Sequence, residues 1–233
     1  MLELHRHSHG PEPLPALRRR LLVAGLGLLV LAAALTAVVA LARGVVQPLD
    51  DAYLRAMEAA RWGPLVTVSK VLSAAFGTAV LWPVRAVVTL VIAVRRQWLA
   101  LGAWVCTVVL SEAAIGPVKA LVDRPRPPGA LLETSGASYP SGHAIASAVT
   151  AIGVVMALTS GRRRLHGMVV AVLVATAVAF SRPYLAAHWL TDVVGGSLIG
   201  AGIALAVPEA FEVARDRRAA RRPVSAGAPP PPA

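Results

Sequence analysis

The sequence predicts an all-α fold, a polytopic membrane protein with six transmembrane helices in one bundle. Of its 233 residues, 56% are hydrophobic and only 15% are charged, whereas a soluble domain carries about 25% charged residues. The charges are also segregated, because short arginine-rich joints alternate with long apolar runs. An apolar run of about 20 residues can cross a bilayer as a helix, so each run is a candidate span.

The first span is predicted at 21–42, directly after three consecutive arginines. A cleaved signal peptide is the alternative, because the Ala-Leu-Ala at 40–42 resembles a cleavage site. The apolar run has about 22 residues, whereas the apolar core of a signal peptide has about 7–15. A retained helix is therefore preferred.

The connection at 44–62 is predicted to form a short amphipathic helix lying on the membrane surface. Leu49, Tyr53 and Met57 fall at helical spacing, which places them on one face. Asp50 and Asp51 fall elsewhere on the same helix. Such a division between an apolar and a charged face is typical of an interfacial helix.

The other five spans follow from the remaining apolar runs. The second, at 64–94, is longer than a crossing requires, and Pro83 is expected to kink it. Lys70 is expected near the outer end of this span. Arg85 lies deeper and needs a partner or an exit to the inner face. The last four spans are predicted at 98–119, 143–159, 165–180 and 191–207.

The chain is expected to have three parts. Residues 1–20 form a cytoplasmic tail, residues 21–208 form the membrane domain, and residues 209–233 form a basic, Pro-rich, disordered cytoplasmic tail. A metal could bind the alternating histidines at 5, 7 and 9, although such tails are more often simply solvated.

Topology explains the net charge of +11, because excess Lys and Arg in short loops marks the cytoplasmic side. With the N-terminus inside, all four arginine-bearing joints and the C-terminus lie inside, whereas the connections at 43–63, 118–142 and 181–190 lie outside. The predicted localisation is the cell membrane, with a multi-pass topology. Nucleic acid is not an expected partner, since neither a basic face on a soluble core nor a set of stacking aromatics is evident.

Three polar clusters fall in two of the predicted outer connections, and polar or ionisable groups at membrane segments are functional candidates. The first cluster is Lys119, six residues, then Arg126 followed by Pro127. Arg can hold phosphate oxygens through two parallel hydrogen bonds, and Lys adds a compact charge. Arg124 is a second, less certain cation. The alternative is that these are ordinary basic residues beside a membrane span.

The second cluster is the run Pro-Ser-Gly-His at 140–143, which opens the fourth span. Ser141 is a good N-cap, and Gly142 lets an oxyanion approach the backbone closely. The N–H groups at a helix start favour anions, and His143 falls in the same turn. A plain capping motif with a chance histidine is the alternative.

The third cluster places Arg182 at the outer end of the fifth span, and His188 and Asp192 four residues apart at the start of the sixth. In a helical turn these two side chains share a face, so Asp192 can accept the proton of one ring nitrogen of His188. The other nitrogen is then free to act as a nucleophile. The alternative is a helix cap made by His and Asp.

The ordered set of clusters resembles the type 2 phosphatidic acid phosphatase (PAP2) superfamily, which also contains vanadium haloperoxidases and glucose-6-phosphatase. The family pattern is Lys-x6-Arg-Pro, Pro-Ser-Gly-His and Ser-Arg-x5-His-x3-Asp, and every specified position is met in order within 119–192. The resemblance implies a PAP2/haloperoxidase-like helical core. It also implies five phosphate-binding residues, which are Lys119, Arg126, Ser141, Gly142 and Arg182.

The resemblance further implies three catalytic residues. His188 would attack phosphorus and form a phosphohistidine, and Asp192 would orient it. His143 would protonate the leaving oxygen and then activate water. The residues alone do not decide which histidine is the nucleophile, although the spacing to Asp192 favours His188. No metal and no cofactor are expected, since three cations can stabilise the charge on the phosphate oxygens.

Glu112 is an acidic residue inside the third span. It precedes Lys119 by seven residues, about two helical turns, so the two share a face. Support of the active site is one expectation for it, and a buried ion pair with Arg85 is the other.

A lipid phosphate or diphosphate is the expected substrate, because its tail could stay in the bilayer while its headgroup enters the site from the side. A polyprenyl diphosphate, such as undecaprenyl diphosphate, is the first choice. Phosphatidate and phosphatidylglycerophosphate are the alternatives. A vanadate-dependent haloperoxidase and a non-enzymatic protein that binds or transports lipid phosphates are rivals from other classes. No obligate protein partner is evident.

Overall fold

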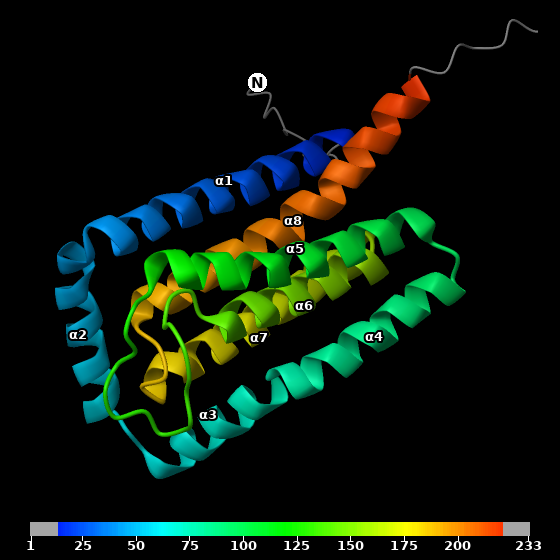
Figure 1. The fold of residues 1–233 in the computed structure, drawn as a ribbon. Coiled ribbons are helices and arrows are strands. Elements are labelled where there is room, and N and C mark those ends of the chain that lie inside the picture. The colour runs from blue at the N-terminus through cyan, green and yellow to red at the C-terminus, as the bar shows by residue number, and fades with distance from the viewer. Residues whose placement is uncertain (1–13, 221–233) are drawn as a thin grey trace, which may run out of the picture.

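The computed structural model describes residues 14–220, and this part of the chain is helical without any strand (Figure 1). The predicted all-α fold class is confirmed. The histidines at 5, 7 and 9 lie outside the described residues. In chain order the helices are α1 (Leu14–Leu41), α2 (Arg43–Ala59), α3 (Gly63–Ala75), α4 (Thr78–Val94), α5 (Trp98–Val122), α6 (Gly142–Leu158), α7 (Gly161–Tyr184) and α8 (Leu190–Ala220).

The predicted spans correspond to these helices in order. Four helices (α1, α5, α7 and α8) are long and apolar enough to cross a membrane, and α3 and α4 together pass the same test as one bent span. The predicted fourth span is α6, an apolar helix of 17 residues. Large side chains such as Val30, Val87 and Leu173 remain exposed on α1, α4 and α7, as expected of helices that face lipid.

The second span bends at a place the sequence did not predict. At Pro83, where a kink was expected, α4 continues without a break in the helix. The 49° bend lies between α3 and α4, where Gly77 adopts an extended conformation. Its N–H donates to the carbonyl of Ala74 at 3.1 Å, and a Cβ at this position would lie 3.2 Å from the same oxygen. The regular helical bond from residue 77 to the carbonyl of Ser73 is thereby replaced.

Close backbone contact joins α6 to α8. A Cβ on Gly196 would lie 2.6 Å from the carbonyl oxygen of Ser141, and a Cβ on Gly200 would lie 2.6 Å from that of Ile145. Small residues of this kind let two membrane helices approach through their backbones. The approach brings the N–H of Ser141 within 3.0 Å of the carbonyl oxygen of Asp192, so the second and third clusters are tied together directly.

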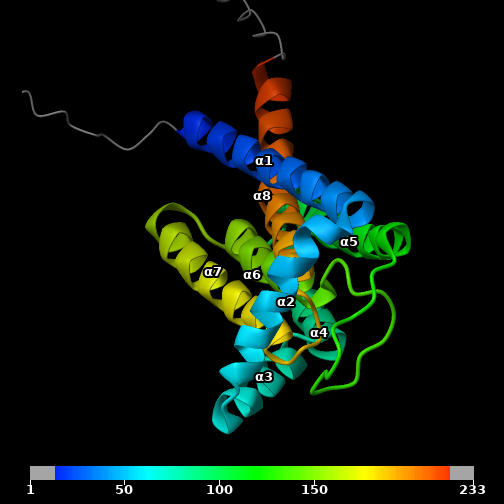
Figure 2. The same cartoon turned by 90° about the vertical axis from the view of Figure 1, so that its left-hand side faces the viewer.

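The two ends of the bundle carry different parts of the chain (Figure 1). The start of α1 and the end of α8 lie at one end, with the α4–α5 and α6–α7 turns that contain the basic joints. The long connection at 123–141 lies at the opposite end, where α2 crosses the bundle and packs against α7 and α8 (Figure 2). The three clusters therefore share one end, as expected.

The predicted amphipathic helix after the first span exists as α2. Its buried residues are Asp50 and Leu54, whereas Leu49 is 57% exposed. Asp50 is buried because Arg124, 74 residues later, lies opposite it at 2.6 Å. A buried ion pair thus holds one face of α2 against the bundle, while Leu49 on another face stays exposed.

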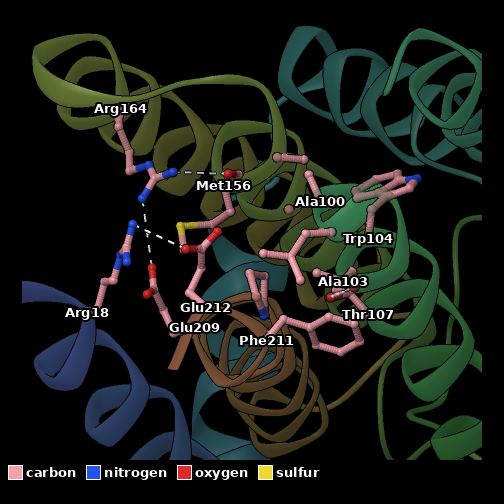
Figure 3. A pocket seen from close by; sticks show the side chains of 14 residues that line it. Arg18, Ala100, Ala103, Trp104, Thr107, Met156, Arg164, Glu209, Phe211 and Glu212 are labelled. Carbon is pink, nitrogen blue, oxygen red and sulfur yellow. Dashed lines mark hydrogen bonds and ion pairs between the residues drawn. The ribbon is translucent and has the colours of Figure 1, made fainter. Parts of the chain in front are cut away.

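Disorder was expected after residue 208. This expectation is wrong for residues 209–220, which continue α8. Opposite charges hold this extension against neighbouring helices (Figure 3). Arg18 of α1 lies 3.2 Å from Glu212 and 2.8 Å from Asp216, and Arg164 of α7 lies 3.8 Å from the buried Glu209. The expected N-terminal tail is shorter as well, because α1 begins at Leu14.

Candidate active site

Two connections meet at the end of the bundle that holds the clusters. The 123–141 connection follows α5, and residues 185–189 join α7 to α8. The N–H of Leu131 donates to the carbonyl of Leu185 at 2.9 Å, and the indole of Trp189 donates to the carbonyl of Pro125 at 2.9 Å. These bonds fix the first cluster against the third.

His188 lies in the α7–α8 connection between a cation and a carboxylate. Its Nε2 is 3.2 Å from Nη1 of Arg126, and its Nδ1 is 3.5 Å from Oδ2 of Asp192. A guanidinium only donates hydrogen bonds, so Nε2 is the acceptor and the ring proton is assigned to Nδ1, facing Asp192. The lone pair of Nε2 consequently points toward Arg126, one of the candidate phosphate-binding cations.

The pKa of His188 is lowered from 6.5 to about 4. Burial is the main cause, and the positive charges of Arg126 and Arg182 act in the same direction, while Asp192 opposes them. A histidine with such a pKa is neutral at physiological pH and keeps a free lone pair on one ring nitrogen. That is the form a nucleophile requires.

Asp192 is held by several donors in the first turn of α8. The N–H of Trp189 donates to its Oδ2 at 2.9 Å, and the hydroxyl of Ser138 donates to the same oxygen. Its Oδ1 accepts from Nη1 of Arg124 at 2.8 Å. A carboxylate with this many donors stays ionised and keeps one orientation beside His188.

Arg124, whose role the sequence left open, is fully buried between two carboxylates. It pairs with Asp50 at 2.6 Å and with Asp192 at 2.8 Å, and its guanidinium lies 5.3 Å from the ring centre of Trp189. Its contacts therefore link α2 to α8, which distinguishes it from the candidate phosphate ligands. Sequence reasoning missed Asp50, because nothing local marks the partner of an arginine so far along the chain.

The cations of the first cluster lie against one stretch of the 123–141 connection. Arg126 donates from Nη2 to the carbonyl of Ser135 at 2.8 Å and from Nε to that of Gly136 at 3.0 Å. Lys119, at the end of α5, donates to the carbonyl of Ala137. The two side chains thereby converge on residues 135–137, three residues before the Pro-Ser-Gly-His run.

Ser73 on α3 contacts one residue from each of the other two clusters, and the sequence did not identify it. Its carbonyl oxygen accepts from Nε2 of His143 at 3.1 Å, and its hydroxyl accepts from Nη1 of Arg182. The carbonyl can do so because Gly77 bonds to Ala74 instead. A glycine four residues after a serine inside an apolar run was the only local signal.

The start of α6 follows the predicted capping pattern. The hydroxyl of Ser141 accepts from the N–H of Ala144 at 3.5 Å, so Ser141 is the N-cap. Gly142 is the first residue of the helix and is partly exposed. The N–H groups of this turn point out of the helix and favour an anion.

A cavity of about 250 Å³ opens beside His143, between the start of α4 and the facing parts of α5 and α6. Arg85 and Glu112 line it, and they form an ion pair at 2.6 Å. Of the two expectations for Glu112, the ion pair with Arg85 is therefore observed. Glu112 and His143 line the same cavity as well.

A helical membrane bundle that gathers two histidines, an aspartate and three cations at one end has the architecture of a membrane phosphatase. Residues 98–216, just over half of the chain, match the model of the PAP2 superfamily. The chain therefore belongs to this superfamily, whose phosphatases hydrolyse phosphate esters. The matched region contains all three clusters, whereas α1 to α4 lie outside it.

Two solved structures share the fold. A PAP2-type phosphatidylglycerolphosphate phosphatase from Bacillus subtilis is 21% identical, with a TM-score of 0.66 over 86% of this chain and 98% of the other. LpxE from Aquifex aeolicus is 22% identical, with a TM-score of 0.53 over 65% of this chain and 89% of the other. No curated protein matches the sequence significantly.

Proposed function

We propose that this protein hydrolyses a lipid phosphate or diphosphate through a covalent phosphohistidine on His188. The observation that carries the proposal is the position of the His188 ring between Arg126 and Asp192. Asp192 faces the protonated nitrogen, so the other nitrogen offers its lone pair on the side of Arg126. This is the arrangement of an oriented nucleophile in covalent catalysis.

In the first step, the lone pair of Nε2 forms a bond to phosphorus and the bond to the lipid oxygen breaks. The leaving oxygen takes its proton from His143. In the second step, water attacks the phosphohistidine, His143 accepts a proton from that water, and phosphate departs from His188. Asp192 keeps the ring of His188 oriented and stabilises its positive charge in the intermediate.

The phosphate oxygens carry the charge that must be stabilised during both steps. We assign this task to the cations Lys119, Arg126 and Arg182, with hydrogen bonds from Ser141 and Gly142. Carbonyl oxygens and the Ser73 hydroxyl now accept the bonds of these cations. Phosphate oxygens are charged acceptors and form stronger bonds with the same donors, so the substrate would replace these acceptors. No metal is needed in this scheme.

A lipid is the proposed substrate because apolar side chains of the membrane bundle line the cavity beside His143. They are Phe76, in the turn between α3 and α4, and Leu81, Trp82 and Ile115, on α4 and α5. A polyprenyl diphosphate, with undecaprenyl diphosphate as the best candidate, is our first choice. Phosphatidate and phosphatidylglycerophosphate are the alternatives. Of these two alternatives, phosphatidylglycerophosphate is supported by the shared fold with the phosphatase from Bacillus subtilis, which is described as acting on phosphatidylglycerolphosphate.

The positive-inside rule supports a cytoplasmic location of both termini and a site at the outer face. A Glu133→Cys variant, made in a Cys106→Ala background, tests this orientation, because Glu133 is exposed in the 123–141 connection. We expect a membrane-impermeant maleimide to label it in intact cells. An Arg215→Cys variant in the same background should react only after lysis. The reverse pattern would contradict the proposed orientation.

The central test is phosphate release by the purified protein in detergent from a panel of lipid phosphates and diphosphates, in the presence of EDTA. We expect turnover of at least one lipid, and none by His188→Ala. A rapidly quenched reaction should contain an acid-labile, alkali-stable phosphoenzyme. If no lipid is hydrolysed, the protein is a non-enzymatic lipid-phosphate binder or carrier. Turnover by His188→Ala would exclude His188 as the nucleophile.

A further inference from the structure

Arg85 is a buried cation of the membrane bundle with one unused edge. Its side chain is 3% exposed. Its Nη1 donates to Glu112 at 2.6 Å and its Nε donates to the hydroxyl of Thr150 at 3.0 Å, while Nη2 has no hydrogen-bond partner. A buried guanidinium N–H without an acceptor is costly. This cost points to an acceptor that arrives with a ligand.

The cavity that Arg85 lines also reaches His143. Its volume of about 250 Å³ is far larger than the ~15 Å³ that a single water needs. Arg85 follows the bend at Gly77 by eight residues, which is about 12 Å along a helix. The cavity therefore runs from the candidate active site toward the membrane interior, and Arg85 is a cation along that path.

The leaving group of the proposed reaction belongs on the His143 side, because His143 would protonate it. For a lipid monophosphate, that group is a neutral alcohol. For a lipid diphosphate, the bridging P–O bond breaks and the leaving group is a lipid monophosphate, which carries negative charge. A buried cation beside the path of the leaving group matches the second case.

We propose that this cavity binds the second, lipid-linked phosphate of a diphosphate substrate and that Arg85 is its ligand. The inference rests on the proposed function and narrows its substrate class. Glu112 neutralises one edge of Arg85 and keeps the guanidinium in place over the ring of Trp82, 5.6 Å away. The other edge remains for a phosphate oxygen, and the apolar walls of the cavity strengthen that contact.

The same pair could instead serve only to stabilise the bundle, since an arginine inside a membrane needs a counter-charge. The two roles differ in one measurable quantity, the ratio of kcat/KM for a diphosphate lipid to kcat/KM for a monophosphate with the same chain. Farnesyl diphosphate and farnesyl phosphate form such a pair. A structural role lowers both values together, whereas a ligand role lowers the ratio.

The experiment measures this ratio for wild type, Arg85→Gln, Arg85→Lys and a lipid-facing control on the same helix, Val87→Ala. We expect Arg85→Gln to lower the ratio by roughly 10- to 100-fold, the range for one hydrogen bond to a charged group. Arg85→Lys should restore part of the loss, and Val87→Ala should keep the wild-type ratio. An equal loss with both substrates would overturn the proposal.

A second measurement does not depend on how the variants fold. A farnesyl methylene-diphosphonate cannot be cleaved between its phosphorus atoms, and it should inhibit wild-type hydrolysis of farnesyl phosphate at least tenfold more strongly than a farnesyl monophosphonate. Equal inhibition by the two compounds would contradict a second phosphate position. If wild type hydrolyses no lipid of the panel, the proposed function fails, and the direct binding ratio of the two phosphonates still tests the site.

Discussion

The carbonyl oxygen of Ser73 accepts a hydrogen bond from Nε2 of His143 at 3.1 Å, across 70 residues of sequence. It does so because the chain changes direction at Gly77, which bonds elsewhere. A carbonyl only accepts, so the contact places a proton on Nε2 of His143, facing the Ser73 carbonyl. The bend between α3 and α4 thus sets the direction in which the candidate acid points.

The hydroxyl of Ser73 gives a first prediction. Ser73→Ala keeps the carbonyl contact with His143 but removes the acceptor of Arg182. We expect kcat/KM for a lipid phosphate to fall about 10-fold, because a positioned cation loses one hydrogen bond. Thr67→Ala is the matched control, since its hydroxyl bonds only within α3 and is exposed. A wild-type kcat/KM in Ser73→Ala would show that Arg182 needs no such support.

The buried pair between Asp50 and Arg124 gives a second prediction. Asp50→Asn leaves part of the charge of Arg124 uncompensated, so we expect unfolding in detergent to become easier by about 3 kcal/mol. Activity should fall too, because Arg124 also holds Asp192. Asp51→Asn is the control, as Asp51 is only partly buried and bonds to Gln47 within α2. Equal stability of the two variants would contradict this account.

The pH dependence of stability follows from the pKa of His188. In the unfolded chain this pKa is 6.5 and in the folded protein it is about 4, so the unfolded state binds more protons between these values. Stability should therefore fall as the pH drops from 6.5 to 4, by about 3 kcal/mol at about 1.4 kcal/mol per pKa unit. Thermal unfolding of wild type and His188→Asn over this range tests the point. The free energy of unfolding should depend more steeply on pH in wild type than in His188→Asn. Identical pH dependence in the two proteins would refute the lowered pKa of His188.

Vanadate inhibition gives a fourth prediction. Vanadate can adopt the five-coordinate geometry of phosphorus in the transition state, and we expect it to inhibit the purified protein below millimolar concentration. Arg126→Lys should weaken inhibition and lower kcat/KM by about 100-fold, because lysine cannot reproduce two parallel hydrogen bonds. Arg162→Lys, in the basic joint at the other end, is the control. Resistance of the wild-type protein to millimolar vanadate would argue against the mechanism.

Local patterns predicted the parts of this protein that depend on neighbours in sequence. The apolar runs predicted the spans, Ser141 was recognisable as an N-cap, and the four-residue spacing from His188 to Asp192 predicted their contact. The contacts that local patterns did not predict join segments that are far apart in the sequence. Asp50 is buried by an arginine 74 residues away, and Ser73 meets a histidine 70 residues away.

The end of α8 and the bend of the second span differ from the expectations for separate reasons. Charge and proline content predicted disorder after residue 208, but Arg18 and Arg164 on other helices hold the extension of α8. Pro83 was expected to bend the second span, yet α4 continues through it as a helix. Gly77 bends the chain instead, and its role depends on the crowding around its Cα.

The close approach of α8 to α6 at Gly196 and Gly200 bears on how inactive variants should be interpreted. Any side chain at these positions would separate the N–H of Ser141 from the carbonyl of Asp192. The oxyanion-binding turn and the carboxylate behind His188 would then move apart, although every reacting group is still present. A genetic screen for lost activity should therefore recover substitutions at Gly196 and Gly200. Such variants would lose activity as catalytic variants do, although neither residue contacts the lipid.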